Sequence, residues 1–188
     1  MKSLNIKSLL FFLGLALTVA SCSKSTTAGT KVKEPFTGNK YESSNRYFRA
    51  VGKGTSQDDN IAKNKADLQA KKELAQQVET RMKVVTDQYL AETETNNGSE
   101  LNDKFQSLIR EVTNTQIADL RKIGEEKYKD TDGKFTVYIA YEIHKKDMLR
   151  FMKKQAKLDA KINEIERKAI EEILDEEIQR IEALGDGE

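Results

Sequence analysis

The chain has 188 residues, of which 34% are charged and 37% hydrophobic, with one cysteine, one histidine and no tryptophan. A single cysteine excludes an intramolecular disulfide and a cysteine-rich metal site, and a single histidine excludes a multi-histidine metal site. With 32 basic and 31 acidic residues the chain is nearly neutral, so its overall charge gives no reason to expect nucleic acid as a partner.

The first residues have the layout of an export signal. Lys2 and Lys7 give a positive start, and residues 9–19 form a largely apolar run without a charge. Eleven residues of helix reach about 17 Å, well short of the roughly 30 Å hydrocarbon core of a bilayer. We therefore expect a cleaved leader here and no permanent membrane-spanning helix. Its removal would take the net charge from +1 to about −1.

The leader ends in Val19-Ala20-Ser21-Cys22, which resembles the lipobox of bacterial lipoproteins. The resemblance implies that residues 1–21 are a signal peptide and that Cys22 carries diacylglycerol and a further acyl chain such as palmitate. Val19 and Ser21 depart from the most frequent lipobox residues but are tolerated variants. Several acyl chains hold a protein more stably than one, since each buried methylene adds about 0.8 kcal/mol. The alternative is an ordinary secretory signal that leaves Cys22 as a free thiol.

A polar segment follows the lipobox over residues 22–44. It is rich in Ser, Thr, Gly and Lys, contains the only proline, Pro35, and shows no hydrophobic period. This composition predicts a flexible tether with a root-mean-square span of roughly 25 Å. Its lysines could alternatively contact anionic headgroups. Ser23 is not the Asp that retains enterobacterial lipoproteins in the inner membrane, which favours the outer membrane.

The pattern over residues 45–148 predicts one α+β domain. Residues 46–51 alternate like a strand, and Gly52-Lys53-Gly54 is expected to end it. Ser56 with Asp59 has the spacing of a capping box, so a long helix is predicted from there to about Ala91. One apolar stripe runs along this helix. It comprises Leu74, Val78, Met82, Val85 and Tyr89.

Three further elements are predicted before the C-terminal region. Residues 96–99 break the long helix, and a shorter amphipathic helix covers 101–112. A weaker strand is expected over about 117–129, with Gly124 at a bulge. A tight Asp-Gly turn at 130–133 then leads into the clearest strand, 135–143. The fold class is therefore α+β: a small antiparallel three-stranded sheet packed by a long helix, followed by a long charged C-terminal helix.

The C-terminal region, residues 149–188, belongs to a helix predicted from Asp147 nearly to the end. Its charges oppose the helix dipole, with a balance of +5 over 145–161 and −5 over 162–182. We hypothesise that two copies of this helix pair antiparallel, so that basic halves meet acidic halves in a homodimer. The alternative is a helix that folds back on its own domain, with its charges solvated. The seam of the homodimer would be Ile162, Ile165, Ile178 and Ile181.

Four other patterns could carry chemistry, and each has a structural explanation that we favour. The glycines of 52–56 could cradle a phosphate but lack the spacing of a nucleotide-binding loop. Asp130 and Asp132 resemble the start of a calcium loop without its later ligands. His144 ends a strand with no triad partner placed near it in sequence. The acidic pairs 125–126 and 171–172 are expected on the solvated surface.

The segment Tyr47–Met148 resembles the LPP-twenty family of bacterial envelope lipoproteins and the N-terminal module of a flagellar-assembly protein. The resemblance implies an α+β domain facing the periplasm or cell surface, with no agreed catalytic residues, and it does not cover the chain beyond Arg150. The residues that carry it are Ala50-Val51-Gly52-Lys53-Gly54, Ala62, Ala66, Ala70, Leu74-Ala75, Asp132-Gly133 and Val137-Tyr138-Ile139-Ala140-Tyr141.

Together these patterns predict a lipid-anchored envelope protein, in the outer membrane, that acts as a structural or protein-interaction module. Its expected partners are the membrane, through Cys22, other envelope proteins and a second copy of the chain. No catalytic residues, cofactor or metal are expected, and no enzymatic activity. The alternative function is an accessory or ligand-binding subunit of an envelope machine for flagellar assembly or export.

Overall fold

The computed structural model describes residues 32–92, 98–114 and 120–185. The chain divides into two units, one up to Lys33 and one from Glu34 onward, and the second unit is called the body below. The expected signal peptide, Cys22 and the first part of the expected tether, up to residue 31, lie outside the described residues.

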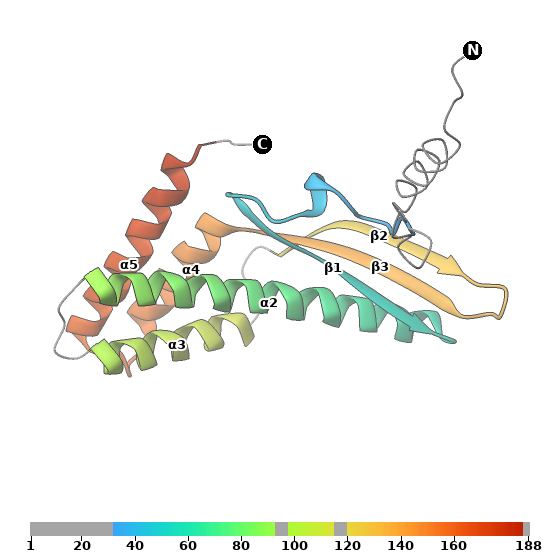
Figure 1. The fold of residues 1–188 in the computed structure, drawn as a ribbon. Coiled ribbons are helices and arrows are strands. Elements are labelled where there is room, and N and C mark those ends of the chain that lie inside the picture. Colours follow the sequence, from blue (N-terminus) through green and yellow to red (C-terminus); the bar gives the residue numbers. More distant parts are fainter. Residues whose placement is uncertain (1–31, 93–97, 115–119, 186–188) are drawn as a thin grey trace, which may run out of the picture. The chain divides into compact units, whose positions relative to one another are not determined.

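The body contains a three-stranded antiparallel sheet in the order β1-β3-β2. The strands are β1 (Tyr47–Ser56), β2 (Arg121–Lys129) and β3 (Phe135–His144), and Figure 1 shows them beside one long helix. The predicted α+β fold class is confirmed. The bulge predicted at Gly124 is also confirmed, because the pairing of β2 with β3 shifts register between Lys122 and Gly124. The first residues of the predicted second strand lie outside the described ranges.

The long helix α2 (Asp59–Glu92) packs on one face of the sheet. A Cβ atom on Gly52 would overlap the carbonyl oxygen of Ala66 and lie 2.6 Å from the nitrogen of Ala70, and Gly54 faces Ala62 in the same way. The glycines therefore let helix and strand approach closely in mid-strand. The prediction that they end the strand is wrong.

The start of α2 also differs from the expected capping box. The Oδ1 atom of Asp58, not the hydroxyl of Ser56, accepts a hydrogen bond from the Ile61 amide at 3.0 Å. Because β1 runs on to Ser56, the residue expected to cap the helix is still in the strand. The predicted apolar stripe is confirmed. Its members are buried except for Tyr89, which packs partly buried against the core.

The other face of the sheet is covered by residues 34–44, which we call the strap. A Cβ atom on Gly124 would lie 2.5 Å from the ring of Phe36, so this ring rests directly on β2. Glu34 pairs with Lys53 at 2.6 Å, and the Ser43 hydroxyl accepts from the Arg49 amide at 2.8 Å. The expected flexible tether therefore does not extend to Ser44, since the chain is bound to the sheet from Glu34 onward.

Three further helices pack around the C-terminal half of α2 (Figure 1), namely α3 (Gly98–Asn114), α4 (Lys145–Leu158) and α5 (Glu164–Ala183). Their apolar faces form the larger part of the core. A C-terminal helix is present, but the prediction of one uninterrupted helix is wrong. The chain turns between Leu158 and Glu164, where Asn163 and Glu166 form a capping box that starts α5.

Candidate functional site

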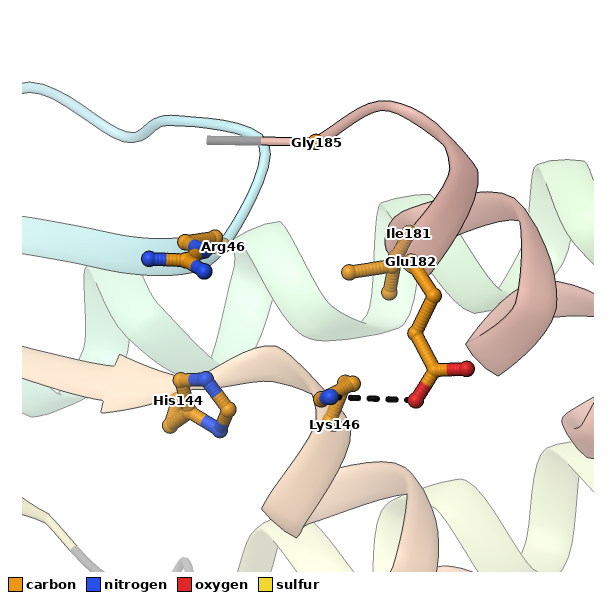
Figure 2. A pocket seen from close by; sticks show the side chains of 6 residues that line it. All are labelled: Arg46, His144, Lys146, Ile181, Glu182 and Gly185. Atoms are coloured by element: carbon orange, nitrogen blue, oxygen red, sulfur yellow. Dashed lines mark hydrogen bonds and ion pairs between the residues drawn. The ribbon is translucent and has the colours of Figure 1, made fainter. Parts of the chain in front are cut away.

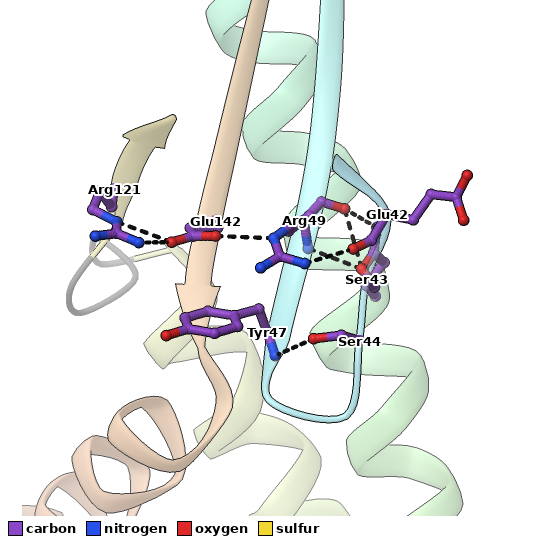
Figure 3. A network of polar contacts seen from close by, with 8 residues as sticks. Glu42, Ser43, Ser44, Tyr47, Arg49, Arg121 and Glu142 are labelled. Carbon is purple, nitrogen blue, oxygen red and sulfur yellow. Dashed lines mark hydrogen bonds and ion pairs between the residues drawn. The ribbon is translucent and has the colours of Figure 1, made fainter. Parts of the chain in front are cut away.

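Three charged side chains line up across the sheet on the face that carries the strap. The register places Arg49 of β1 and Arg121 of β2 on either side of Glu142 of β3. The Nε atom of Arg49 lies 2.9 Å from Oε2 of Glu142, and Nε of Arg121 lies 2.9 Å from Oε1 (Figure 3). Glu142 is only 4% exposed, so both of its oxygens are held by guanidinium groups in a largely dry position.

The two arginines keep Glu142 ionised. Burial by itself would raise the pKa of this carboxyl, but the hydrogen bonds from Arg121 and Arg49 outweigh burial and hold the pKa below its usual value. Arg49 is fixed in turn, since it donates to the Glu42 carbonyl at 3.0 Å and lies 4.8 Å from the centre of the Tyr47 ring. An ionised carboxylate has no proton to donate, and one with a lowered pKa is a weak base, so this arrangement is typical of a structural ion pair.

His144 lies at the end of β3 as predicted, but its ring is not simply solvated. Its Nδ1 atom lies 2.9 Å from Oδ2 of Asp147 in the first turn of α4, and its ring meets Tyr47 edge-on at 5.2 Å. These contacts join the sheet to α4.

His144 lines two pockets. One, of about 340 Å³, is lined by Tyr47, Arg121, Glu142, His144 and Asp147. The other, of about 180 Å³, lies between the start of β1 and the last turn of α5, where Lys146 pairs with Glu182 at 3.0 Å (Figure 2). Pockets for organic ligands usually measure about 300–1,000 Å³, so only the first reaches that range.

The helices α4 and α5 lie antiparallel, with the basic residues of one against the acidic residues of the other. Lys146 pairs with Glu182 at 3.0 Å, Lys153 with Asp175 at 2.6 Å and Lys157 with Glu171 at 3.6 Å. The opposed charge halves seen in the sequence are thus paired within one chain. The region folds back on its own domain, as in the alternative to the antiparallel homodimer, but its charges are paired and not solvated as that alternative expected.

The four isoleucines of the hypothesised seam do not share one exposed face. Ile162 and Ile181 are buried in the core, with 2% and 7% of their surface exposed, and Ile178 packs against the core partly buried. Ile165 is 82% exposed. Fold-back brings three of the four into the core of their own domain and leaves Ile165 on the surface.

Helix α5 is also tied to α2 by polar contacts that sequence patterns did not indicate. Arg81 Nη2 lies 2.6 Å from Oε1 of Glu177, whose side chain is 2% exposed. The Tyr89 hydroxyl donates to Glu172 at 3.0 Å, and burial together with this carboxylate raises the pKa of Tyr89 to about 12. The only sequence signal was that Glu177 falls within the apolar face of its helix.

The other candidate patterns have structural roles. In the glycine segment the Lys53 amide donates to the Gln69 side chain at 3.2 Å, so it is not directed at a ligand. In the Asp-Gly turn the Gly133 amide donates to the Asp130 carbonyl at 3.0 Å, which closes the hairpin. Glu125 pairs with Lys63 at 2.7 Å. Among the described residues no three His, Cys, Asp or Glu side chains are grouped so as to hold a metal ion.

Within the described ranges, no helix has both the length and the apolar content needed to cross a bilayer. Comparison with known proteins adds no relative: no family model matches the sequence, and no curated protein or solved structure is significantly similar to the chain.

Proposed function

We propose that this protein is a lipoprotein of the bacterial cell envelope, anchored in the outer membrane through Cys22, that acts as a structural or protein-interaction module without catalysis. The observation that carries the proposal is the lipobox-like Val19-Ala20-Ser21-Cys22 directly after an uncharged apolar run. The only cysteine of the chain stands at the one position that a lipobox requires.

The described part of the body is consistent with a non-catalytic role. Its most buried carboxylates, Glu142 and Glu177, are both paired with arginines and serve to hold elements together. The resemblance of Tyr47–Met148 to the LPP-twenty family supports the same assignment. In this view the body is a rigid unit that the lipid keeps at the membrane surface, where it meets other envelope proteins.

A second candidate is an accessory or ligand-binding subunit of an envelope machine for flagellar assembly or export. It draws on the resemblance to a flagellar-assembly module and on the pocket of about 340 Å³ beside His144. The two candidates differ in their partners. Crosslinking of intact cells followed by mass spectrometry of proteins bound to the full chain separates them: components of a motor or export machine favour the second candidate, and other envelope proteins favour the first.

Metabolic labelling with an alkyne fatty acid tests the anchor. Cells producing the native chain should yield a labelled protein in the membrane fraction, and the Cys22→Ala variant should be unlabelled. Ser21→Ala, which keeps a small residue before the cysteine, is the matched control and should label like the native chain. An unlabelled native chain would overturn the proposed anchoring.

A further inference from the structure

The turn between α4 and α5 leaves two large apolar side chains on the surface. Leu158, at the end of α4, is 68% exposed, and Ile165, in the first turn of α5, is 82% exposed. Single exposed apolar residues need no explanation, but these two flank the same five-residue turn of a charged helical hairpin. Their spacing in the sequence would place both side chains on one side of the helix if the turn itself became helical.

The sequence of this region allows a helix to run straight through the turn. Residues 145–184 contain neither glycine nor proline. The turn is held by Ile162, which is buried in the core, and by polar caps: Oδ1 of Asp159 accepts from the Lys161 amide at 2.8 Å, and Asn163 and Glu166 cap each other. Caps of this kind contribute modestly to the stability of a helix, and new contacts in a dimer can replace their contribution.

Helix α5 is the last helix of the described residues, and its contacts are made with parts of the body that precede the turn. Its acidic side chains pair with Lys146 and Lys153 of α4, and its Glu177 pairs with Arg81 of α2. A second copy of α5 could make every one of these contacts in the same way, because each involves one partner on α5 and one on the rest of the body.

We infer that two copies of this chain exchange α5 when the turn between α4 and α5 becomes helical. The partner that fits the α5-binding surface of α2 and α4 is then α5 of a second copy of the chain. In the exchanged dimer, residues 145–183 form one helix, and each α5 packs on the partner's α2 and α4. The single long helix that the sequence pattern predicts is then the open form of this region. The two helices of the structure are its closed form.

The exposed pair supports this arrangement. Leu158 and Ile165 are seven residues apart, two turns of helix, so in the open form they lie on the same side. They are also equally distant from the midpoint between Lys161 and Ile162. A two-fold axis through that midpoint therefore places Leu158 of one copy opposite Ile165 of the partner subunit, and the reverse, which would bury all four side chains.

Charge exchange between two differently tagged full chains tests the inference. Arg81→Glu and Glu177→Arg each place like charges in a buried pair, within one chain and in a dimer of identical variants. In a mixed exchanged dimer, one site has the native pair and the other the reversed pair, so both attract. Co-expressed Arg81→Glu and Glu177→Arg chains should therefore co-purify from detergent-solubilised membranes at least about tenfold more than either variant with itself.

Two control variants separate helix exchange from other causes of co-purification. Lys168→Glu reverses a charge on α5 at a side chain that is 77% exposed, so two copies of this variant should co-purify as well as two native copies do. Replacing Ala160 and Lys161 together by glycine disfavours a helix through the turn. Two copies of this double variant should co-purify at least about tenfold less than two native copies, and this test does not depend on the folding of the charge variants.

The same experiment can overturn the inference. Copies that only share a detergent micelle would co-purify equally in the like and the mixed pairings, and that result excludes exchange. Undiminished co-purification of chains with two glycines in the turn also excludes exchange. The exchange involves only the body, so its failure would leave lipidation of Cys22 unaffected.

Discussion

Arg49 and Glu142 face each other across β1 and β3, with 2.9 Å between Nε of the arginine and Oε2 of the carboxylate. Glu142 is the central member of a row of three charges that spans the whole sheet, since Arg121 binds its other oxygen from β2. The row links the first strand of the body to the last two. It also lies where β3 passes into α4, so it fixes the sheet next to the helical part of the core.

Glu142→Gln should destabilise the fold by about 1–3 kcal/mol at pH 7, because the neutral amide leaves two arginines without their charged acceptor. The folded pKa of Glu142 lies below the ordinary value of 4.5. Its stabilising contribution is therefore fully present above that value and is lost as the pH falls through the lower folded pKa. Urea unfolding at pH values from 7 to 2.5 measures the free energy of unfolding of both proteins. The difference in this free energy between the native and variant proteins should become smaller as the pH falls.

Glu126→Gln is the matched control for this measurement, because Glu126 lies on the same face of the sheet and is exposed. It should change the free energy of unfolding by less than about 0.5 kcal/mol. A Glu142→Gln protein as stable as the native one at pH 7 would show that the charged row contributes nothing to stability.

Gly52→Ala should be more damaging than its size suggests. The added methyl group would overlap the backbone of Ala66 on α2, which cannot move aside like a flexible side chain. Overpacking of this kind costs about 1–3 kcal/mol or more. Thr55→Ala, on the same strand but the opposite face, should cost less than about 1 kcal/mol in the same chemical denaturation experiment. Equal stability of the two variants would contradict the direct packing of α2 on β1.

Phe36→Ala should release the strap without unfolding the body. The Phe36 ring rests on Gly124, and Phe36 has a φ of 57°, a left-handed backbone conformation that a bulky residue rarely adopts unless its contacts require it. Hydrogen exchange should accelerate in residues 34–44 and stay unchanged in α2. Gly124→Ala should have the same effect from the sheet side. Val32→Ala, at a side chain that is 77% exposed, should have none.

The strap shortens the segment between the proposed lipid anchor and the body. If Cys22 carries lipid as we propose, residues 23–33 separate it from the first residue held by the sheet. Slow exchange in residues 34–44 of the Phe36→Ala protein would mean that the strap is held by its polar bonds, such as Glu34 with Lys53, and not by the aromatic contact.

Periodicity was enough to predict the elements with a strong local pattern. The alternation of 135–143 correctly predicted a strand, and Ile139 and Glu142 lie on its opposite faces, with Ile139 towards the helix. The three- and four-residue steps along α2 correctly predicted its buried stripe, of which only Tyr89 is partly exposed. These predictions are correct because which residues of a regular helix or strand are buried follows from the period of that element.

The glycines of β1 and the strap depend on contacts distant in sequence. Gly52 and Gly54 suit a turn or a close approach equally well, and the deciding feature is the row of alanines in the next helix. The strap has the composition of a linker, and only Phe36 and Tyr41, whose rings lie 5.0 Å apart, distinguish it from one.

The C-terminal hairpin shows a different limit. The charge halves of the region correctly indicated antiparallel pairing, but charge alone does not say whether the two halves belong to one chain or two. The capping pattern from Asn163 to Glu166 was the local sign of a break. The row formed by Arg49, Glu142 and Arg121 had no local sign, because strand register is fixed by the fold as a whole.

The most direct test of the proposed lipoprotein is the intact mass of the native chain, purified from the membrane fraction of cells that produce it. We predict a polypeptide that begins at Cys22 and exceeds its amino-acid mass by one diacylglycerol and one acyl chain. A chain that keeps its first 21 residues, or that has an unmodified thiol at Cys22, would contradict it.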